Sequence, residues 1–478
     1  MARSGIVTGA RFARALLAGS AGVACAIGAA GPAQACGGCF NAGVSAPVVA
    51  HRMAFAISQG RTVLWDQFQF TGSPDEFSWV LPITPGAYLE LSRDAWFEAL
   101  EATTSIRVQP PVLNCADRGT SGGGGCGADD DVALSADSGG FGSPGGVTVL
   151  SRASIGPYET VTLRSTSGDE LTGWLLQNGF IVPPDVVPII AAYVQEGADF
   201  IALKLRPSAG VLQMQPVRVI TPNGPPILPL RMVAAGAAES VDIVLYVIGD
   251  RRFAMPDFTE VTVEASDISY DFAQSSSNYL ELRQQALSFN GGQAFLTAYA
   301  APGFFNPTRR PSPFGASFVD SYFQQALRDV GITNRNPCGS VSERIADEGQ
   351  LVVPDCDDPQ QCDLLPNADQ VPASEFTCLD ATDLSAALLG QRPTDTWLTR
   401  LELRLPRTAL TSDCLIQPSV SQAALSNALQ ATKFQNPPCD LPVFSSSLSP
   451  ARPRSIGAGL LAALLAGTVL RRAGRRRG

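Results

Sequence analysis

The chain has 478 residues, of which 45% are hydrophobic and 16% charged, and its formal net charge is −10 at neutral pH. All 44 acidic residues lie between positions 36 and 450, whereas ten of the 34 basic residues lie outside this range. The range therefore holds 24 basic against 44 acidic residues, a net charge of −20. Such a surface disfavours nucleic acid and anionic lipid as partners. Residues 36–450 are numerous enough to form two or three ordinary domains.

A cleavable export signal is predicted over residues 1–35. Three arginines, at positions 3, 11 and 14, precede an apolar run of small residues at 15–30, and Ala33-Gln34-Ala35 has the small residues of a cleavage site. Cleavage there would leave Cys36 as the mature N-terminus. Lipidation of Cys36 is the alternative to simple cleavage.

A transmembrane helix is predicted over residues 455–470. Sixteen helical residues span roughly 24 Å of a hydrocarbon core about 30 Å thick, and long basic side chains beyond them can reach the interface. Positive charge stays in the cytoplasm, so 471–478 is the expected cytoplasmic tail and 36–450 the expected ectodomain, in the periplasm or at the cell surface. The alternative is a sorting tail that is cut away. The flanking arginines are Arg471, Arg472, Arg475, Arg476 and Arg477.

An even number of cysteines follows the signal, which predicts disulfides in an exported protein. Closeness in sequence pairs Cys36 with Cys39 and Cys115 with Cys126. A redox CxxC begins a helix, whereas Gly43 and Pro47 argue against a helix after Cys39, so a structural disulfide is favoured over thiol redox chemistry. The ten candidates are Cys36, Cys39, Cys115, Cys126, Cys338, Cys356, Cys362, Cys378, Cys414 and Cys439.

The N-terminal half of the ectodomain is predicted to alternate strands and short helices. Alternating β-branched and aromatic residues at 48–82 predict a β meander, and 92–105 predicts a helix capped by Ser92. Residues 147–164 return to strand. Helices are then expected at 169–180 and 184–197, followed by a strand at 199–207.

The second half continues this mixture. Four prolines between 222 and 229 predict edge strands and turns. Residues 240–250 read as a buried strand, 396–406 as an alternating strand, and 318–331 and 419–431 as amphipathic helices. Because no regular βαβ order occurs, the predicted class is α+β with mixed, mostly antiparallel sheets. The expected parts are 36–112 (β-rich), 113–146 (Gly/Asp loop), 147–335 (α+β core), 336–378 (Cys-rich loop), 379–437 (strand and helix) and 438–454 (linker).

Several of these stretches together resemble a family of exported bacterial proteins catalogued as domain of unknown function 2330. The resemblance implies a shared fold and an exported location. That family has no established activity, so no catalytic residue is carried over, and the loops 113–146 and 336–378 are elaborations on its pattern. The stretches are Cys36-Gly37-Gly38, "FSWVLPI" (77–83), "GWLLQNGF" (173–180), "YVQEGADFIALKL" (193–205), "QPVRV" and "PILPLRM" (within 215–232) and "WLTRLELRL" (397–405).

Motifs of common catalytic sites are missing from the sequence. His51 is the only histidine, and its place in an alternating strand predicts a half-exposed strand residue rather than part of a triad. An aspartic protease needs two Asp-Thr/Ser-Gly loops, and the chain has one, Asp137-Ser138-Gly139, inside a glycine-rich loop. Neither a nucleophile elbow nor a phosphate-binding glycine loop occurs.

Calcium is the one cofactor for which residues can be named. Carboxylates gather in two short loops, Asp129–Asp131 and 354–364, the second of which contains the candidates Asp355, Asp357, Asp358 and Asp363. The central glycine and terminal glutamate of an EF-hand loop are missing. A solvated acidic loop is the alternative, and no other cofactor is predicted.

These features favour a non-catalytic binding or structural ectodomain, held at the cell envelope by its C-terminal helix. The membrane is then one partner, nucleic acid is not, and the extracytoplasmic ligand or protein stays open. The alternative is a carboxylate-dependent envelope hydrolase, because glycosidase carboxylates are defined by a separation in space, on the order of 5–10 Å. The sequence leaves open whether the chain is an enzyme.

Overall fold

The computed structural model describes residues 39–40, 48–70, 78–113, 146–180, 182–206, 214–234, 237–306, 317–329, 382–391 and 394–438. The predicted signal, the predicted transmembrane helix with its arginine tail, and the four calcium candidates Asp355, Asp357, Asp358 and Asp363 lie outside the described residues. Within them, no helix has both the length and the apolar character needed to cross a membrane.

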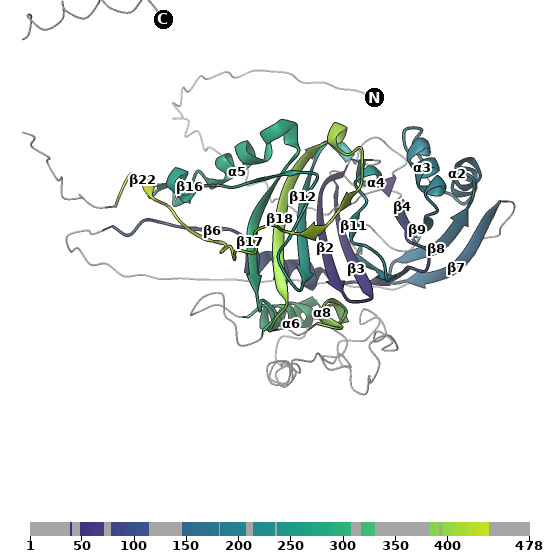
Figure 1. Cartoon of the computed structure of the whole chain (residues 1–478), viewed down its shortest axis with the longest axis horizontal. Helices are drawn as coiled ribbons and strands as arrows, with labels where there is room; N and C mark the ends of the chain where they lie inside the picture. The colour runs from purple at the N-terminus through teal and green to yellow at the C-terminus, as the bar shows by residue number, and fades with distance from the viewer. Residues whose placement is uncertain are drawn as a thin grey trace, which may run out of the picture.

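An eight-stranded sheet forms the centre of the molecule (Figure 1). Its pairs are antiparallel except β2 with β12 and β14 with β17, which are parallel. Its strands in spatial order are β14 (Thr259–Val261), β17 (Ala294–Pro302), β18 (Trp397–Pro406), β12 (Ala237–Gly249), β2 (Val48–Ser58), β3 (Arg61–Phe70), β10 (Val217–Pro222) and β5 (Tyr88–Leu91).

A second, five-stranded sheet is antiparallel throughout. The predicted meander over 48–82 is right for the hairpin of β2 and β3 and wrong for the third strand, which leaves the first sheet and pairs with residues 199–204 in the second. The strands in spatial order are β1 (Cys39–Phe40), β4 (Ser78–Ile83), β9 (Asp199–Leu205), β8 (Tyr158–Ser165) and β7 (Val147–Ile155).

The two sheets face each other across the main hydrophobic core. Met53 and Phe55 of β2 share this core with Leu81 of β4, Leu203 of β9 and Leu245 of β12. Alternation along each strand sends these side chains to one face, and each apolar side chain buried in this way contributes about 1.5–3 kcal/mol. The predicted α+β class with mixed, mostly antiparallel sheets is confirmed.

Helices cover the outer face of each sheet. Trp96, Phe318 and Leu384 belong to the helices that pack on the eight-stranded sheet, α1 (Asp94–Thr104), α6 (Phe318–Asp329) and α8 (Thr382–Leu388). Leu171 and Ile190 belong to the helices that pack on the five-stranded sheet, α2 (Gly168–Gln177) and α3 (Val187–Gln195). The result is four layers, helix, sheet, sheet and helix.

The start of helix α2 is set by a local side-chain cap, whereas the start of helix α1 is set by a contact with a residue distant in sequence. Ser167 caps α2, because its hydroxyl accepts a hydrogen bond from the backbone N–H of Glu170. The cap predicted for α1 at Ser92 is wrong. Its N-cap is Arg93, whose backbone N–H donates to the buried carboxylate of Asp383 instead.

Two predictions for the second half are wrong. Residues 419–431 do not form a helix, because their backbone pairs with other segments: Leu425 bridges Ala300, and β21 (Ala428–Gln430) pairs with β6 (Arg107–Gln109). Such tertiary pairing overrides helix propensity. Strand β10 lies inside the sheet rather than at an edge, since its first proline, Pro222, is its last residue.

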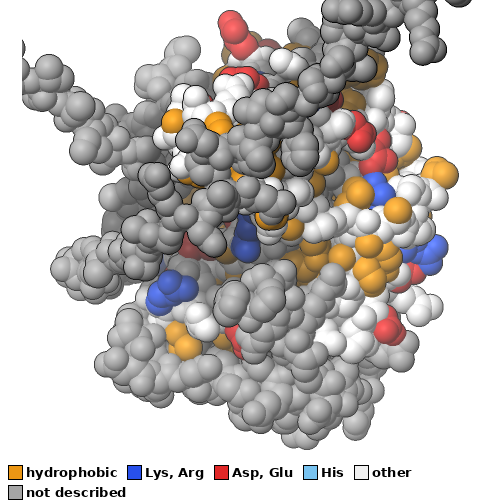
Figure 2. All heavy atoms as spheres, turned by 90° about the vertical axis from the view of Figure 1, so that its left-hand side faces the viewer, with side chains coloured by type: hydrophobic (Ala, Val, Ile, Leu, Met, Phe, Trp, Pro, Cys, Tyr) orange, Lys and Arg blue, Asp and Glu red, His pale blue; other side chains and the backbone are white. Residues whose placement is uncertain are grey.

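A small satellite core lies at the end of the molecule that Figure 2 shows, where hydrophobic side chains are seen among charged ones. It contains Ile268, Tyr279 and Ala431, beneath the sheet of β15 (Ser269–Asp271), β16 (Ser276–Ser277) and β22 (Lys433–Gln435). The remaining short elements are α4 (Leu230–Ala234), α5 (Tyr279–Leu287), β11 (Ile227–Leu228), β13 (Phe253–Ala254), β19 (Cys414–Leu415) and β20 (Gln417–Pro418).

Candidate functional site

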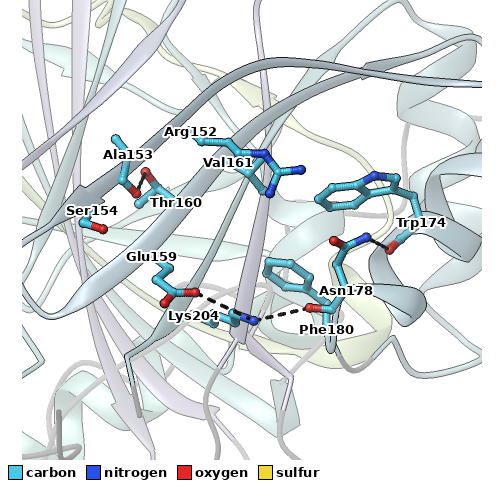
Figure 3. Close-up of a pocket in the computed structure, with 10 residues that line it drawn as sticks. All are labelled: Arg152, Ala153, Ser154, Glu159, Thr160, Val161, Trp174, Asn178, Phe180 and Lys204. Carbon is cyan, nitrogen blue, oxygen red and sulfur yellow. Dashed lines mark hydrogen bonds and ion pairs between the residues drawn. The ribbon is translucent and has the colours of Figure 1, made fainter. Parts of the chain in front are cut away.

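A cavity of about 230 Å³ opens on the outer face of the five-stranded sheet, beside the C-terminal end of α2 (Figure 3). We call it the α2 pocket. Strands β7, β8 and β9 supply one wall, and helix α2 with the turn that follows it supplies the other. Its lining residues are Arg152, Ala153, Ser154, Glu159, Thr160, Val161, Trp174, Asn178, Phe180 and Lys204.

Strand register explains the charged wall. Glu159 of β8 pairs directly with Lys204 of β9, and Val161 of β8 pairs with Arg152 of β7. Residues two apart in a strand share a face, so these side chains stand on the side of the sheet that α2 covers. The register thus brings two cations and a carboxylate from three strands to one place.

The end of α2 explains the aromatic wall. Gly179 has φ +78°, a conformation that favours glycine, and its N–H donates to the carbonyl of Leu176. The N–H of Phe180 donates to the carbonyl of Leu175 at 2.9 Å. This pair of bonds is the Schellman motif, which ends the helix and turns the chain back. It brings the ring of Phe180 to 6.4 Å from that of Trp174.

The charges of the pocket interact with the rings and with each other. Lys204 Nζ lies 3.9 Å from the carboxylate of Glu159 and 5.7 Å from the ring centre of Phe180, and it donates to the carbonyl of Asn178 at 3.4 Å. The guanidinium of Arg152 lies 5.8 Å from the ring centre of Trp174. Figure 3 shows Arg152 and Lys204 approaching the rings from the strand side.

The lining is therefore aromatic at its base and net positive. Trp174 and Phe180 are 3% and 5% exposed, whereas Arg152 is exposed and Lys204 half-buried. Two cations against one carboxylate stand out in a chain whose net charge is −10. Cations beside apolar rings suit a ligand that carries a negative group.

A second cavity, of about 280 Å³, lies between the two sheets near the end of α3. Its lining is mostly apolar, and its carboxylates, Glu196 and Asp413, both form ion pairs with Arg231. The hydroxyl of Tyr193 also donates to Asp413, at 2.8 Å. Hydrogen bonds from Arg231 lower the pKa of Glu196. These carboxylates are thus tied to one guanidinium.

His51 lies in neither cavity. It was expected to be half-exposed, but it is 1% exposed, because β2 lies between two other strands of the large sheet and this residue is on the face toward the main core. Its Nδ1 lies 3.1 Å from a carboxylate oxygen of Asp66, whose pKa is raised by burial. The sole histidine forms a buried pair within the sheet.

Cys414 differs from the prediction of a disulfide at this position. It is a free, buried thiol in the main core, on a strand that pairs with β11. Burial raises the pKa of this thiol to about 12. The side chains of the other nine candidates lie outside the described residues, so their pairing stays a prediction. Among the described side chains, no three potential ligands gather as a metal site.

The family model described as "Uncharacterized protein conserved in bacteria (DUF2330)" matches residues 30–311, more than half of the chain. The chain belongs to this family. The DUF2330 match contains every residue that lines the α2 pocket, and it ends before β18, so the stretch 397–405 lies outside the matched range. No curated protein and no solved structure matches the chain.

The pocket residues of this DUF2330 protein were not selected as site candidates from the sequence. Trp174, Asn178 and Phe180 lie in the stretch 173–180, which was used for the family resemblance and as part of a predicted helix, and not as a site. A usable signal was Lys204, one of only two lysines in the chain, placed on a mostly apolar predicted strand. Its partners come from other strands, so only the register reveals the group.

Proposed function

We propose that this chain is a non-catalytic binding protein of the bacterial cell envelope, whose α2 pocket receives a negatively charged group of a partner outside the cytoplasm. The observation that carries the proposal is the meeting of Arg152 and Lys204 over Trp174 and Phe180. Guanidinium and ammonium groups form charge-assisted hydrogen bonds with anions, roughly twice as strong as neutral ones.

The surroundings of the cations support binding of moderate strength. The rings of Trp174 and Phe180 exclude water from the base of the pocket, and a lower local dielectric strengthens each charge interaction. Glu159 already neutralises part of the charge of Lys204, at 3.9 Å. An incoming anion therefore competes with this carboxylate, which limits affinity and favours ligands that make further contacts.

The chemistry of both cavities supports binding over hydrolysis. A carboxylate-dependent hydrolase needs a carboxylic acid whose pKa is raised so that it can donate a proton. Among the described residues, Glu159 is the only carboxylate that lines the α2 pocket. In the second cavity the pKa of Glu196 is lowered by Arg231, the opposite of what a general acid requires.

The proposed location rests on the two ends of the sequence. The signal pattern of 1–35 and the apolar segment 455–470 with its arginine cluster support an ectodomain outside the cytoplasm and a retained anchor. Intact mass of protein purified from its own envelope tests this. A mass that begins at Cys36 and ends at Gly478 is expected, and a shorter C-terminus would replace the anchor by a sorting tail.

Binding is tested on the full-length protein with two single blocked amino acids, N-acetylglutamate methylamide and its glutamine counterpart, by ligand-observed NMR. The glutamate probe should bind more tightly than the glutamine probe, and Lys204→Gln and Arg152→Gln should each weaken it. Arg251→Gln is the matched control, because Arg251 is an exposed cation that forms its ion pair with neighbouring Asp250. Equal binding of both probes by all variants would overturn the proposal.

A further inference from the structure

Strand β7 is a long edge beside the α2 pocket. It is the outermost strand of the five-stranded sheet and pairs with β8 alone among the described strands (Figure 1). It has nine residues, whereas the other outer strands of the two sheets, β1, β5 and β14, have two, four and three. Proteins usually shorten or cover edge strands, because an open edge offers N–H and C=O groups to other chains.

The part of β7 next to the pocket is regular. The register shifts between Val149 and Ser151, which is the mark of a bulge, and from Ser151 to Ile155 each residue pairs in step with β8. Residues 151–154 are exposed, and three of them, Arg152, Ala153 and Ser154, line the pocket. One five-residue stretch therefore borders both a sheet edge with which no further described strand pairs and a net positive cavity.

From this juxtaposition we propose that the partner of the α2 pocket is an extended polypeptide segment, which adds to the edge of β7 as a further strand and places an acidic side chain in the pocket. The inference rests on the function proposed above and names the class of partner. Backbone hydrogen bonds to the edge would give affinity, and the pocket would give specificity.

Geometry and charge both favour this occupant. Neighbouring strands lie about 4.8 Å apart, so alternate side chains of an added strand would stand beside Arg152 and Ser154, on the face that α2 covers. The cation that a glutamate on such a strand would meet is Arg152, one strand spacing of about 4.8 Å away, whereas Lys204 lies two strands further, on β9. An acidic side chain is proposed for the partner because the pocket lining contains two cations and one carboxylate.

The test uses the full-length protein and the blocked pentapeptide acetyl-Thr-Val-Glu-Val-Thr-amide, with Gln or Lys in place of Glu as controls. Calorimetry should show the Glu peptide binding at least tenfold more tightly than the Gln peptide, and also more tightly than N-acetylglutamate methylamide. N-methylation of single peptide nitrogens should weaken binding at alternate positions only, since every second N–H of an added strand faces β7. Those backbone amides of 151–155 that face away from β8, at alternate positions, should gain protection from hydrogen exchange.

The outcomes separate the two proposals. If the pentapeptide binds no better than the single blocked glutamate, or if N-methylation has no alternating effect, strand addition is overturned while the anion pocket stands. If Glu, Gln and Lys peptides bind equally, with alternating N-methyl sensitivity, the acidic specificity is overturned. If none of the carboxylate probes binds, both proposals fall. Arg152→Gln should weaken the Glu peptide about tenfold, and Arg251→Gln should leave it unchanged.

Discussion

In the eight-stranded sheet, Arg218 is fully buried and forms ion pairs with Asp383 and Glu90, at 2.8 and 2.7 Å. In the five-stranded sheet, Lys204 is one-fifth exposed and lies 3.9 Å from Glu159. Both sites combine cations, carboxylates and aromatic rings. The first joins elements that are distant in sequence, whereas the second lines an open cavity.

The difference lies in how completely the charges are enclosed. The Asp383 carboxylate accepts hydrogen bonds from Arg218, from the indole of Trp65 and from the backbone N–H of Arg93, so α8, the sheet and the start of α1 are tied to one group. Glu159 and Lys204 meet at the rim of a cavity. We therefore expect the enclosed charges to contribute mainly to stability, and the charges at the cavity to contribute mainly to the proposed binding.

The largest effect is expected for Asp383→Ala. It leaves Arg218 buried without the more deeply buried of its two carboxylate partners, and breaking a buried pair in this way costs about 3–5 kcal/mol of the free energy of unfolding. Urea denaturation of the full-length protein measures it. The control is Asp250→Ala, which breaks an exposed pair with Arg251 and should cost no more than about 1 kcal/mol. Equal losses in both variants would remove the contrast between enclosed and exposed charges.

A smaller effect is expected where α2 crosses α3. A Cβ on Gly168 would lie 2.7 Å from both Cα and Cβ of Ala191, so Gly168→Ala should push the helices apart and cost about 1–3 kcal/mol. Because α2 carries Trp174, binding of the glutamate probe should weaken too. Gly173→Ala, in the same helix with nothing within 4 Å, should instead stabilise by up to about 1 kcal/mol. Destabilisation by both would point to helix α2 being displaced by any added side chain.

The pH dependence of stability is expected to depend on Asp94, the first residue of helix α1. Burial raises the pKa of Asp94 to about 6 from a usual value near 3.8. The folded protein therefore binds more protons than the unfolded chain between about pH 4 and pH 6, and its stability falls as pH rises through this window. Asp94→Asn should remove this fall, on the order of 1–3 kcal/mol. Denaturation curves at pH 4, 5, 6 and 7 measure it.

The control for that experiment is Asp271, whose pKa shift and effect on the pH dependence of stability have the opposite sign. Hydrogen bonding from Asn436 lowers the pKa of the exposed Asp271, so its contribution is present at higher pH and is lost as pH falls. Asp271→Asn should therefore lose stability relative to the natural protein above about pH 4. If the Asp94→Asn curve ran parallel to that of the natural protein, burial of this carboxylate would have no thermodynamic consequence.

The sequence predicted the elements better than their partners. Strand β18 and helix α6 were predicted from their periodicity, because burial of one face imposes it, and strand β12 was predicted from its apolar run. Strand β9 and helix α1 were also predicted. The strand at 78–83 was assigned to the wrong sheet, and His51 was expected to be half-exposed although it is buried, since neither pairing nor layer order is encoded locally. Residues 419–431 have a helical pattern that pairing with β6 and Ala300 overrides.

The α2 pocket could not be predicted from the sequence, because it too depends on strand pairing, which is not encoded locally. Trp174 and Phe180 come close through a local motif, the helix end at Gly179, which the pattern "WLLQNGF" contains. Arg152, Glu159 and Lys204 meet only through the register of three strands. A local motif can be found in one sequence, whereas a site assembled by register needs the fold.

The smallest effect on stability, and the sharpest on binding, is expected for Lys204→Gln. Its ion pair with Glu159 is partly exposed, and such pairs contribute about 0–1 kcal/mol, so the unfolding midpoint should barely move. The same change removes one of two cations at the pocket and should weaken binding of N-acetylglutamate methylamide about tenfold. Paired urea titration and calorimetry on one preparation measure both quantities. A loss of stability comparable to that of Asp383→Ala would show that this charge is as structural as the enclosed one, and the division between the two sheets would fail.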